Sequence, residues 1–236
     1  IRDSNVLATN FITPTGRAIL TDLMPVASEE FKRQHMLPDH ELLRQVICTE
    51  GEIQLEVAFC PRPCYGSKDG HIKNLGVQGL RIDVGRGAYF LRSSVPLRVH
   101  GNEARAEISI RAGDVVHFSL SYSEESPAVL PALGESARAA IERSVKWWQT
   151  WAARAKYQGP YRDAVVRSAL ALKLLAYAPS GAVTAAVTTS LPERLGDTLN
   201  WDYRFCWLRD ASLTVRALLG LGYMEETESF MTWLLH

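Results

Sequence analysis

The sequence is poor in cysteine. Only 4 of its 236 residues are cysteine, too few for the disulfide framework of a small secreted protein. Cys48 and Cys206 are isolated, and Cys60 and Cys64 have no histidine pair at the spacing of a zinc site. We therefore predict no metal site, and we interpret the cysteines as reduced thiols of a cytoplasmic protein.

The sequence also lacks net charge and long apolar runs. Lys plus Arg number 26, and Asp plus Glu number 26, so no basic surface for nucleic acid or an anionic membrane is indicated. Its apolar runs are too short to cross a bilayer. We expect no nucleic acid and no membrane as partner. A neutral ligand such as a sugar fits this balance.

What is present divides into two periodicities. Up to about residue 123, apolar and polar side chains alternate, most clearly in residues 52–59 and 103–111. Alternation with period two is typical of strands that bury one face. Turn signals such as Thr13-Pro14-Thr15-Gly16 separate these runs. The pattern predicts an antiparallel β-sandwich domain over residues 1–123.

The second half has the period of helices. Residues 124–134 contain two prolines and no clear period, so we interpret them as a linker. The first apolar stripe with helical spacing is Ile141, Val145, Trp148, Ala152 and Ala155. Further helices are predicted at about residues 161–178, 210–219 and 225–236. Residues 135–236 therefore form a helical domain, and the predicted fold class is multidomain, β followed by α.

Both ends of the sequence resemble cut ends. Residues 5–12 read as a strand that is expected to pair with an earlier one. The last predicted helix still has apolar spacing where the chain stops, at Phe230, Met231, Leu234 and Leu235. We therefore expect the chain to be a fragment that lacks its first strands and the end of its helical domain.

Residues 200–210 are the densest group of unusual side chains. Their sequence, Asn-Trp-Asp-Tyr-Arg-Phe-Cys-Trp-Leu-Arg-Asp, contains four aromatic residues, two arginines and two aspartates. Sugars pack their C–H faces on aromatic rings, and their hydroxyls bind planar carboxylate and guanidinium groups. A pocket with apolar walls and a few convergent polar groups can be built from this mixture.

The residues alone leave structural roles open. Asp210 precedes a predicted helix and fits an N-cap. Arg209 fits an ion pair with a carboxylate elsewhere, and the tryptophans fit a core. Composition favours sugar binding here without deciding between these alternatives.

Several motifs together resemble glycoside hydrolase family 15, and more narrowly its bacterial glucoamylase/trehalase-like branch. The resemblance covers nearly the whole chain. It is carried by residues 5–7, 21–25, 177–182, 188–193 and 200–212. It implies an N-terminal β-super-sandwich followed by the first helices of an (α/α)6 toroid of a truncated catalytic domain. It also implies inverting hydrolysis of an α-glucosidic bond without a cofactor.

The same resemblance implies roles for four residues. Arg209 and Asp210 match the arginine and aspartate that hold hydroxyls of the terminal glucose in fungal relatives. Tyr203 matches a tyrosine near the ring oxygen, and Trp207 matches a tryptophan that lines the pocket. Such contacts favour an oxocarbenium-like transition state when they tighten as the ring flattens.

Neither catalytic carboxylate is predicted within the chain. Inverting hydrolysis needs an acid and a base roughly 6.5–9.5 Å apart. Glu225 and Glu226 open a helix, where the dipole favours negative charge, so we interpret them as structural. Glu193 lies in a loop and the resemblance gives it no catalytic role. The resemblance places both glutamates on later helices, beyond His236, so the chain alone is expected to be inactive.

Three hypotheses follow. The leading one is a bacterial cytoplasmic glycosidase of carbohydrate metabolism that acts on maltooligosaccharides, a related α-glucan or trehalose. The second is a non-catalytic carbohydrate-binding or scaffolding module. The third is a structural fragment whose tryptophans all belong to a core.

Overall fold

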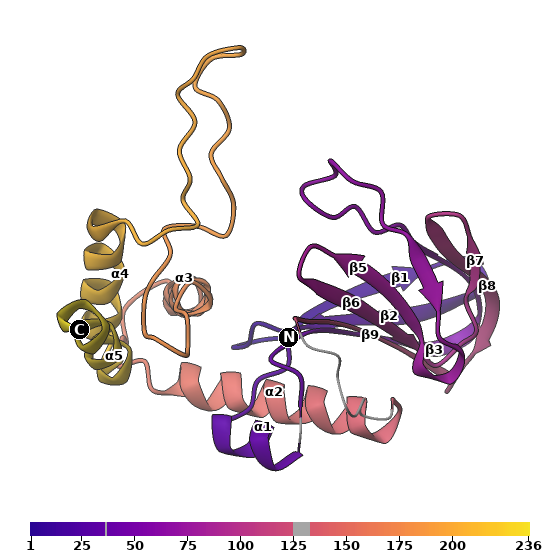
Figure 1. Cartoon of the computed structure of the whole chain (residues 1–236). Coiled ribbons are helices and arrows are strands. Elements are labelled where there is room, and N and C mark those ends of the chain that lie inside the picture. Colours follow the sequence, from indigo (N-terminus) through magenta and orange to yellow (C-terminus); the bar gives the residue numbers. More distant parts are fainter. Residues whose placement is uncertain (36, 125–132) are drawn as a thin grey trace. The chain divides into compact units, whose positions relative to one another are not determined.

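The computed structural model describes residues 1–35, 37–124 and 133–236, and Figure 1 shows the course of the chain. It contains two compact units. The sheet unit comprises Ile1 and Val6–Trp147, and the helical unit comprises Arg2–Asn5 and Trp148–His236. Each unit has its own buried core.

The sheet unit is built on one antiparallel sheet of nine strands within the described residues (Figure 1). Its central path runs β1-β2-β3-β9-β6-β5-β4, and β8 joins β3 to β7. The strands are β1 (Leu7–Ile12), β2 (Gly16–Leu23), β3 (His40–Phe59), β4 (Ile72–Asn74), β5 (Leu80–Val84), β6 (Gly87–Ser93), β7 (Arg98–His100), β8 (Glu103–Arg111) and β9 (Val115–Ser123).

The long strand β3 changes partners along its length. Its first part pairs with β2 and β9, and its second part, from Glu52 to Phe59, pairs with β8. The change occurs at Gly51, whose φ is +64°. A Cβ atom at Gly51 would lie 2.1 Å from the carbonyl oxygen of Thr15, so no larger residue fits without moving the backbone.

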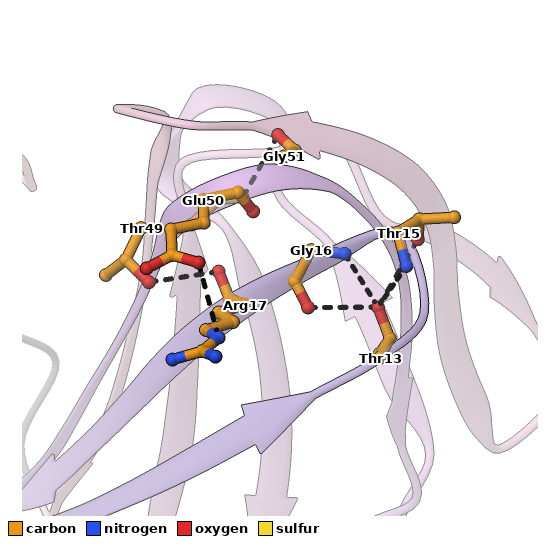
Figure 2. A network of polar contacts seen from close by, with 8 residues as sticks. Thr13, Thr15, Gly16, Arg17, Thr49, Glu50 and Gly51 are labelled. Carbon is orange, nitrogen blue, oxygen red and sulfur yellow. Dashed lines mark hydrogen bonds and ion pairs between the residues drawn. The ribbon is translucent and has the colours of Figure 1, made fainter.

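Polar contacts hold the chain at this change of partner (Figure 2). The Thr13 hydroxyl accepts a hydrogen bond from the Gly16 amide at 3.1 Å. Arg17 pairs with Glu50 at 3.3 Å, and the Thr49 hydroxyl donates to the Arg17 carbonyl at 3.3 Å. The Thr13 contact lies within the predicted turn at residues 13–16, and the two Arg17 contacts join the start of β2 to β3.

The two parts of β3 share one apolar core. Val46 from its first part and Ile53 from its second belong to the same buried cluster, together with Ala104 and Ile110 of β8. The predicted alternation is confirmed in both runs, because buried or half-buried positions alternate with more exposed ones along residues 52–59 and along β8. The sequence-predicted antiparallel sheet is therefore present.

The described residues form five α-helices. They are α1 (Glu29–His35), α2 (Glu135–Ala153), α3 (Arg162–Leu174), α4 (Leu208–Gly220) and α5 (Met224–Leu235). Helices α2, α4 and α5 confirm the predicted periodicity. Helix α1 was not predicted, because it has seven residues and none of them is buried. It therefore lacks the apolar stripe that marks a helix in sequence.

The predicted helix 161–178 is four residues too long at its end. Helix α3 stops at Leu174 because the following backbone binds another segment. The amide of Tyr177 donates to the carbonyl of Ala182 at 2.7 Å, and the amide of Thr184 donates to the carbonyl of Leu175 at 3.0 Å. These bonds replace the helical ones.

One buried carboxylate joins three elements of the helical unit. Glu226 of α5 is 7% exposed. Its Oε1 accepts a hydrogen bond from the indole N–H of Trp151 in α2 at 2.7 Å and lies 3.0 Å from Nζ of Lys173 in α3. Burial alone would raise the pKa of Glu226, but the hydrogen bonds from Trp151 and Lys173 outweigh it, so the pKa lies below its ordinary value.

Aromatic stacking surrounds this carboxylate. The Trp151 ring stacks on Tyr223 with centroids 4.0 Å apart and an interplanar angle of 7°. Tyr223 is fully buried, and its hydroxyl donates to the carbonyl of Ala152 at 3.4 Å. Because Glu226 is itself buried, the low local dielectric strengthens its charged hydrogen bonds.

The architecture is an antiparallel sheet followed by helices, as predicted at that level. The compact units divide between Trp147 and Trp148, inside α2. The predicted domains, 1–123 and 135–236, stay predictions, and residues 125–132 of the predicted linker 124–134 lie outside the described part of the chain.

The Glu226 contacts generate a prediction about stability. Glu226→Gln is expected to lower the free energy of unfolding at pH 7 by about 2 kcal/mol, because Lys173 loses its counter-charge in a partly buried site. The neighbouring variant Glu225→Gln is the matched control. Glu225 pairs with Arg154 at 3.0 Å but its side chain is 73% exposed, so its loss is expected to cost less than about 1 kcal/mol.

The pH dependence of the same variants checks the cause. Because the folded pKa of Glu226 is lowered, its stabilisation is complete above the unfolded pKa of about 4.3 and is lost as pH falls through the folded value. Urea unfolding of wild type and Glu226→Gln is therefore expected to converge at acidic pH. An equal difference at pH 7 and at pH 3 would contradict a role for the charge.

Candidate functional site

The residues singled out in the sequence lie on a long segment between α3 and α4. This site segment, residues 175–207, projects from the helical unit as a long loop that runs outward and returns along itself (Figure 1). Its two limbs are joined by backbone hydrogen bonds from Ala186 to Tyr203 and from Ser190 to Trp201, both 2.8 Å long. Their antiparallel pairing brings residues 201–205 beside 185–190.

Close packing fixes the base of the site segment. Gly181 has φ +84°, and a Cβ atom there would lie 2.4 Å from the carbonyl oxygen of Ser229 in α5. Only glycine therefore allows this approach without a shift. Val183 is buried beside Ala211 of α4 and Phe230 of α5. The two limbs thus start from a point held by both helices.

Aromatic rings form the apolar part of the site. Trp207 and Tyr203 have ring centroids 5.3 Å apart, tilted by 51°. Trp201 meets Trp207 edge to face at 6.2 Å. The indole N–H of Trp207 donates to the carbonyl of Asp202 at 2.9 Å. Trp207 is half-buried and Trp201 is 42% exposed, so ring surface remains open to a ligand.

Charged groups follow directly in the first turn of α4. Arg209 and Asp210 pair at 3.0 Å, and the Arg209 side chain is 67% exposed. The Arg209 guanidinium carbon lies 5.7 Å from the Trp207 ring centroid, within the range of a cation–π contact. Asp210 lies where the helix dipole favours a carboxylate.

The structure brings the four predicted residues together. Tyr203, Trp207, Arg209 and Asp210, the wall residues, are linked in one chain of contacts from Tyr203 to Trp207, to Arg209 and to Asp210. They combine two aromatic rings, a guanidinium and a carboxylate in one series of contacts. Such a group can hold a hydroxyl-rich ligand through charged hydrogen bonds and ring contacts.

The structure gives a separate answer for each structural role that the sequence left open, namely an N-cap, a distant ion pair and a core. The N-cap of α4 is Trp207, without a side-chain cap bond, so the alternative of Asp210 as N-cap is wrong. Arg209 pairs with its own neighbour instead of a distant carboxylate. The exposure of Trp201 does not fit a core role, whereas Trp148 and Trp151 are buried.

Two pairs at the site were not singled out in the sequence. Arg204 and Asp202 pair at 2.7 Å. The indole N–H of Trp201 donates to Glu193 at 3.3 Å. The Asp-x-Arg spacing at 202–204 was the one sequence signal for the Asp202–Arg204 ion pair. Side chains two residues apart meet only if the backbone bends between them, and the spacing does not reveal such a bend. Residue Glu193 therefore contacts the aromatic group, across the two limbs.

The described part of the chain offers no metal centre. Across residues 1–35, 37–124 and 133–236, no three His, Cys, Asp or Glu side chains are placed to hold a metal ion. In the same ranges no helix is long and apolar enough to cross a membrane. All four cysteines are free thiols. The expectation of no cofactor stays a prediction.

A cavity of about 330 Å³ lies in the sheet unit, lined by parts of α1, β3 and α2. Glu41 faces it and accepts a hydrogen bond from the Ser119 hydroxyl at 2.5 Å. Burial raises the pKa of Glu41 against the opposing effects of Ser119 and nearby arginines. Arg143 stacks over the Phe31 ring at 4.6 Å. The Nε atom of Arg143 is buried without a hydrogen-bond partner among the described residues. The wall residues remain the better candidate site, because the resemblance seen in the sequence falls on them and not on this cavity.

Comparison with known proteins gives the family of the chain. A family profile described as glycosyl hydrolases family 15 matches residues 159–236. A trehalase of Thermoplasma volcanium is 32% identical over 238 residues, covering 97% of this chain and 36% of that protein. A trehalase of Mycobacterium tuberculosis is 31% identical over 249 residues, covering 98% and 36%. A trehalase of Thermoplasma acidophilum is 45% identical over 91 residues, covering 39% and 16%.

The chain belongs to glycosyl hydrolase family 15. The resemblance drawn from the sequence motifs is thereby confirmed. Nearly the whole chain matches two of these trehalases, but it covers only 36% of the length of each.

The packing of Gly181 generates a prediction for the site segment. Gly181→Ala is expected to destabilise the protein by about 2–3 kcal/mol, because it adds a backbone clash to the cost of positive φ. Gly196→Ala is the matched control. Gly196 has φ +81°, but a Cβ atom there would meet no other atom within 4 Å, so its cost is expected to be about 1 kcal/mol.

Urea unfolding followed by tryptophan fluorescence measures both glycine variants. Equal losses for Gly181→Ala and Gly196→Ala would show that the contact with α5 does not constrain the base of the site segment.

Proposed function

We propose that the protein hydrolyses an α-glucosidic bond, with trehalose as its substrate, and that the wall residues bind one glucose ring. One observation carries this proposal: Tyr203, Trp207, Arg209 and Asp210 form a continuous, partly exposed group. The trehalase names of the relatives favour trehalose over a maltooligosaccharide or a longer α-glucan.

The wall residues have distinct roles in this proposal. Arg209 donates hydrogen bonds to glucose hydroxyls, and the Asp210 carboxylate accepts them. Trp207 supplies an apolar face for the ring C–H groups, while Tyr203 lies near the ring oxygen. Contacts that tighten as the sugar flattens towards an oxocarbenium-like transition state raise the rate, whereas contacts equal in both states only improve binding.

The proton transfers are assigned to residues outside this chain. Inverting hydrolysis needs a general acid and a general base on opposite sides of the bond, roughly 6.5–9.5 Å apart to admit water. We propose that two glutamates beyond His236 supply them, as the family resemblance implies. The limited share of each relative that the chain covers supports this assignment.

We further propose that the helices begin an (α/α)6 toroid and that the sheet is a super-sandwich. Apolar side chains on α4 and α5 support the first part, because they are exposed where further helices would cover them. They are Leu208, Leu213, Leu219, Met224, Met231, Leu234 and Leu235. The shared core of the two parts of β3 supports the second. A bacterial cytoplasmic location stays a prediction.

The full-length gene product that carries this chain tests the function. We expect it to hydrolyse trehalose, and we expect Arg209→Ala to lower kcat/KM by roughly 10–100-fold, because a charged hydrogen-bonding partner is lost. Arg216→Ala is the matched control, since Arg216 is an exposed arginine on the same helix. It is expected to leave kcat/KM unchanged.

Product analysis separates the alternatives. Inversion at one anomeric carbon of trehalose gives one β-glucose and one α-glucose, whereas retention gives α-glucose alone. Release of α-glucose alone would contradict the inverting mechanism. A protein that cleaves maltotetraose but does not cleave trehalose would be a glucoamylase. A protein that binds the sugar but hydrolyses neither substrate would be a carbohydrate-binding module. Full activity of Arg209→Ala would remove the wall residues from the site.

A further inference from the structure

Asp202 and Arg204 form a forked pair within the site segment. Oδ1 of Asp202 accepts hydrogen bonds from the backbone amide of Arg204 at 3.0 Å and from its Nε at 2.9 Å. Oδ2 accepts a bond from the second guanidinium nitrogen at 2.7 Å. Three bonds between residues two apart fix the direction of the chain at Tyr203, which lies between them.

The backbone of Asp202 also holds Trp207. Its carbonyl accepts the indole N–H at 2.9 Å. An indole has one donor, so Trp207 cannot turn without breaking that bond. The carboxylate of Asp202 therefore fixes a peptide whose carbonyl in turn fixes the ring. Tyr203, beside that peptide, lies 5.3 Å from Trp207.

The position of this pair argues against a mainly stabilising role. The side chains of Asp202 and Arg204 are 31% and 40% exposed, and ion pairs so open to water contribute little to stability. Their side chains bind each other around Tyr203, and the backbone carbonyl of Asp202 binds the indole N–H of Trp207. The effect of the pair is therefore on the orientation of the backbone and rings, and not on the stability of the fold.

We propose that Asp202 and Arg204 are positioning residues, which hold Trp207 and Tyr203 in the orientation that a glucose ring requires. This inference rests on the proposed function, because that function makes the two rings a sugar-binding surface. According to this inference, neither Asp202 nor Arg204 contacts the sugar. When the rings of Trp207 and Tyr203 are already oriented, sugar binding does not have to order them, so less conformational entropy is lost.

The full-length protein with trehalose as substrate tests the inference. Arg204→Ala is expected to raise KM roughly tenfold and to lower kcat less than that, since the Trp207 ring face holds substrate and transition state alike. Arg204→Lys is expected to restore little, because an ammonium cannot form the fork. Asp202→Asn is expected to act in the same direction as Arg204→Ala. The control Arg216→Ala is expected to keep the wild-type KM.

Two physical measurements separate positioning from general damage. The near-ultraviolet circular dichroism of the aromatic side chains is expected to weaken in Arg204→Ala, because Trp207 loses its fixed surroundings. The midpoint of thermal unfolding is expected to stay close to the wild-type value. A rise in KM that accompanies a large fall in this midpoint would overturn the inference.

The failure of this inference differs from failure of the proposed function. If the wild type hydrolyses trehalose and Arg204→Ala keeps its KM and near-ultraviolet signal, only the positioning role is overturned. If the wild type neither binds nor hydrolyses any α-glucoside, the proposed function is overturned and the positioning role for a sugar falls with it.

Discussion

The helical unit depends on a carboxylate that is buried but still charged. Glu226 joins α5 to Trp151 of α2 and to Lys173 of α3. A buried charge without such partners would be costly, so these contacts fix where the helices lie. The same α5 carries Ser229 and Phe230, against which the base of the site segment packs. The placement of the wall residues therefore follows from a structural ion pair outside the proposed sugar site.

Sequence reasoning succeeded where one apolar face is repeated regularly. The alternation in residues 52–59 and 103–111 and the stripe along α2 each bury one side, and each was found. It failed where the deciding contacts are distant in sequence. β3 runs unbroken through Gly51, where the carbonyl of Thr15 leaves no room for a side chain. Helix α3 ends early because residues 182 and 184 take part in the backbone bonds that follow it. No local pattern contains either contact.

The candidate site shows the same division. Composition at 200–210 was enough to predict aromatic and charged groups in one place, and the family resemblance supplied the roles proposed for Arg209 and Asp210. Orientation was not predictable. The ring of Trp207 is set by a carbonyl five residues earlier, and that carbonyl is set by a side-chain fork. In the proposed site, the wall residues bind the sugar and the contacts of Asp202 and Arg204 orient the rings.

The central claim is that the wall residues bind a glucose ring. A crystal structure of the full-length protein with a non-hydrolysable trehalose analogue tests it most directly, through the distance between the Arg209 guanidinium and the nearest sugar hydroxyl. The account predicts a distance of about 3 Å, with one glucose ring packed on Trp207. A sugar bound in the protein with Arg209 and Trp207 both out of contact would contradict it.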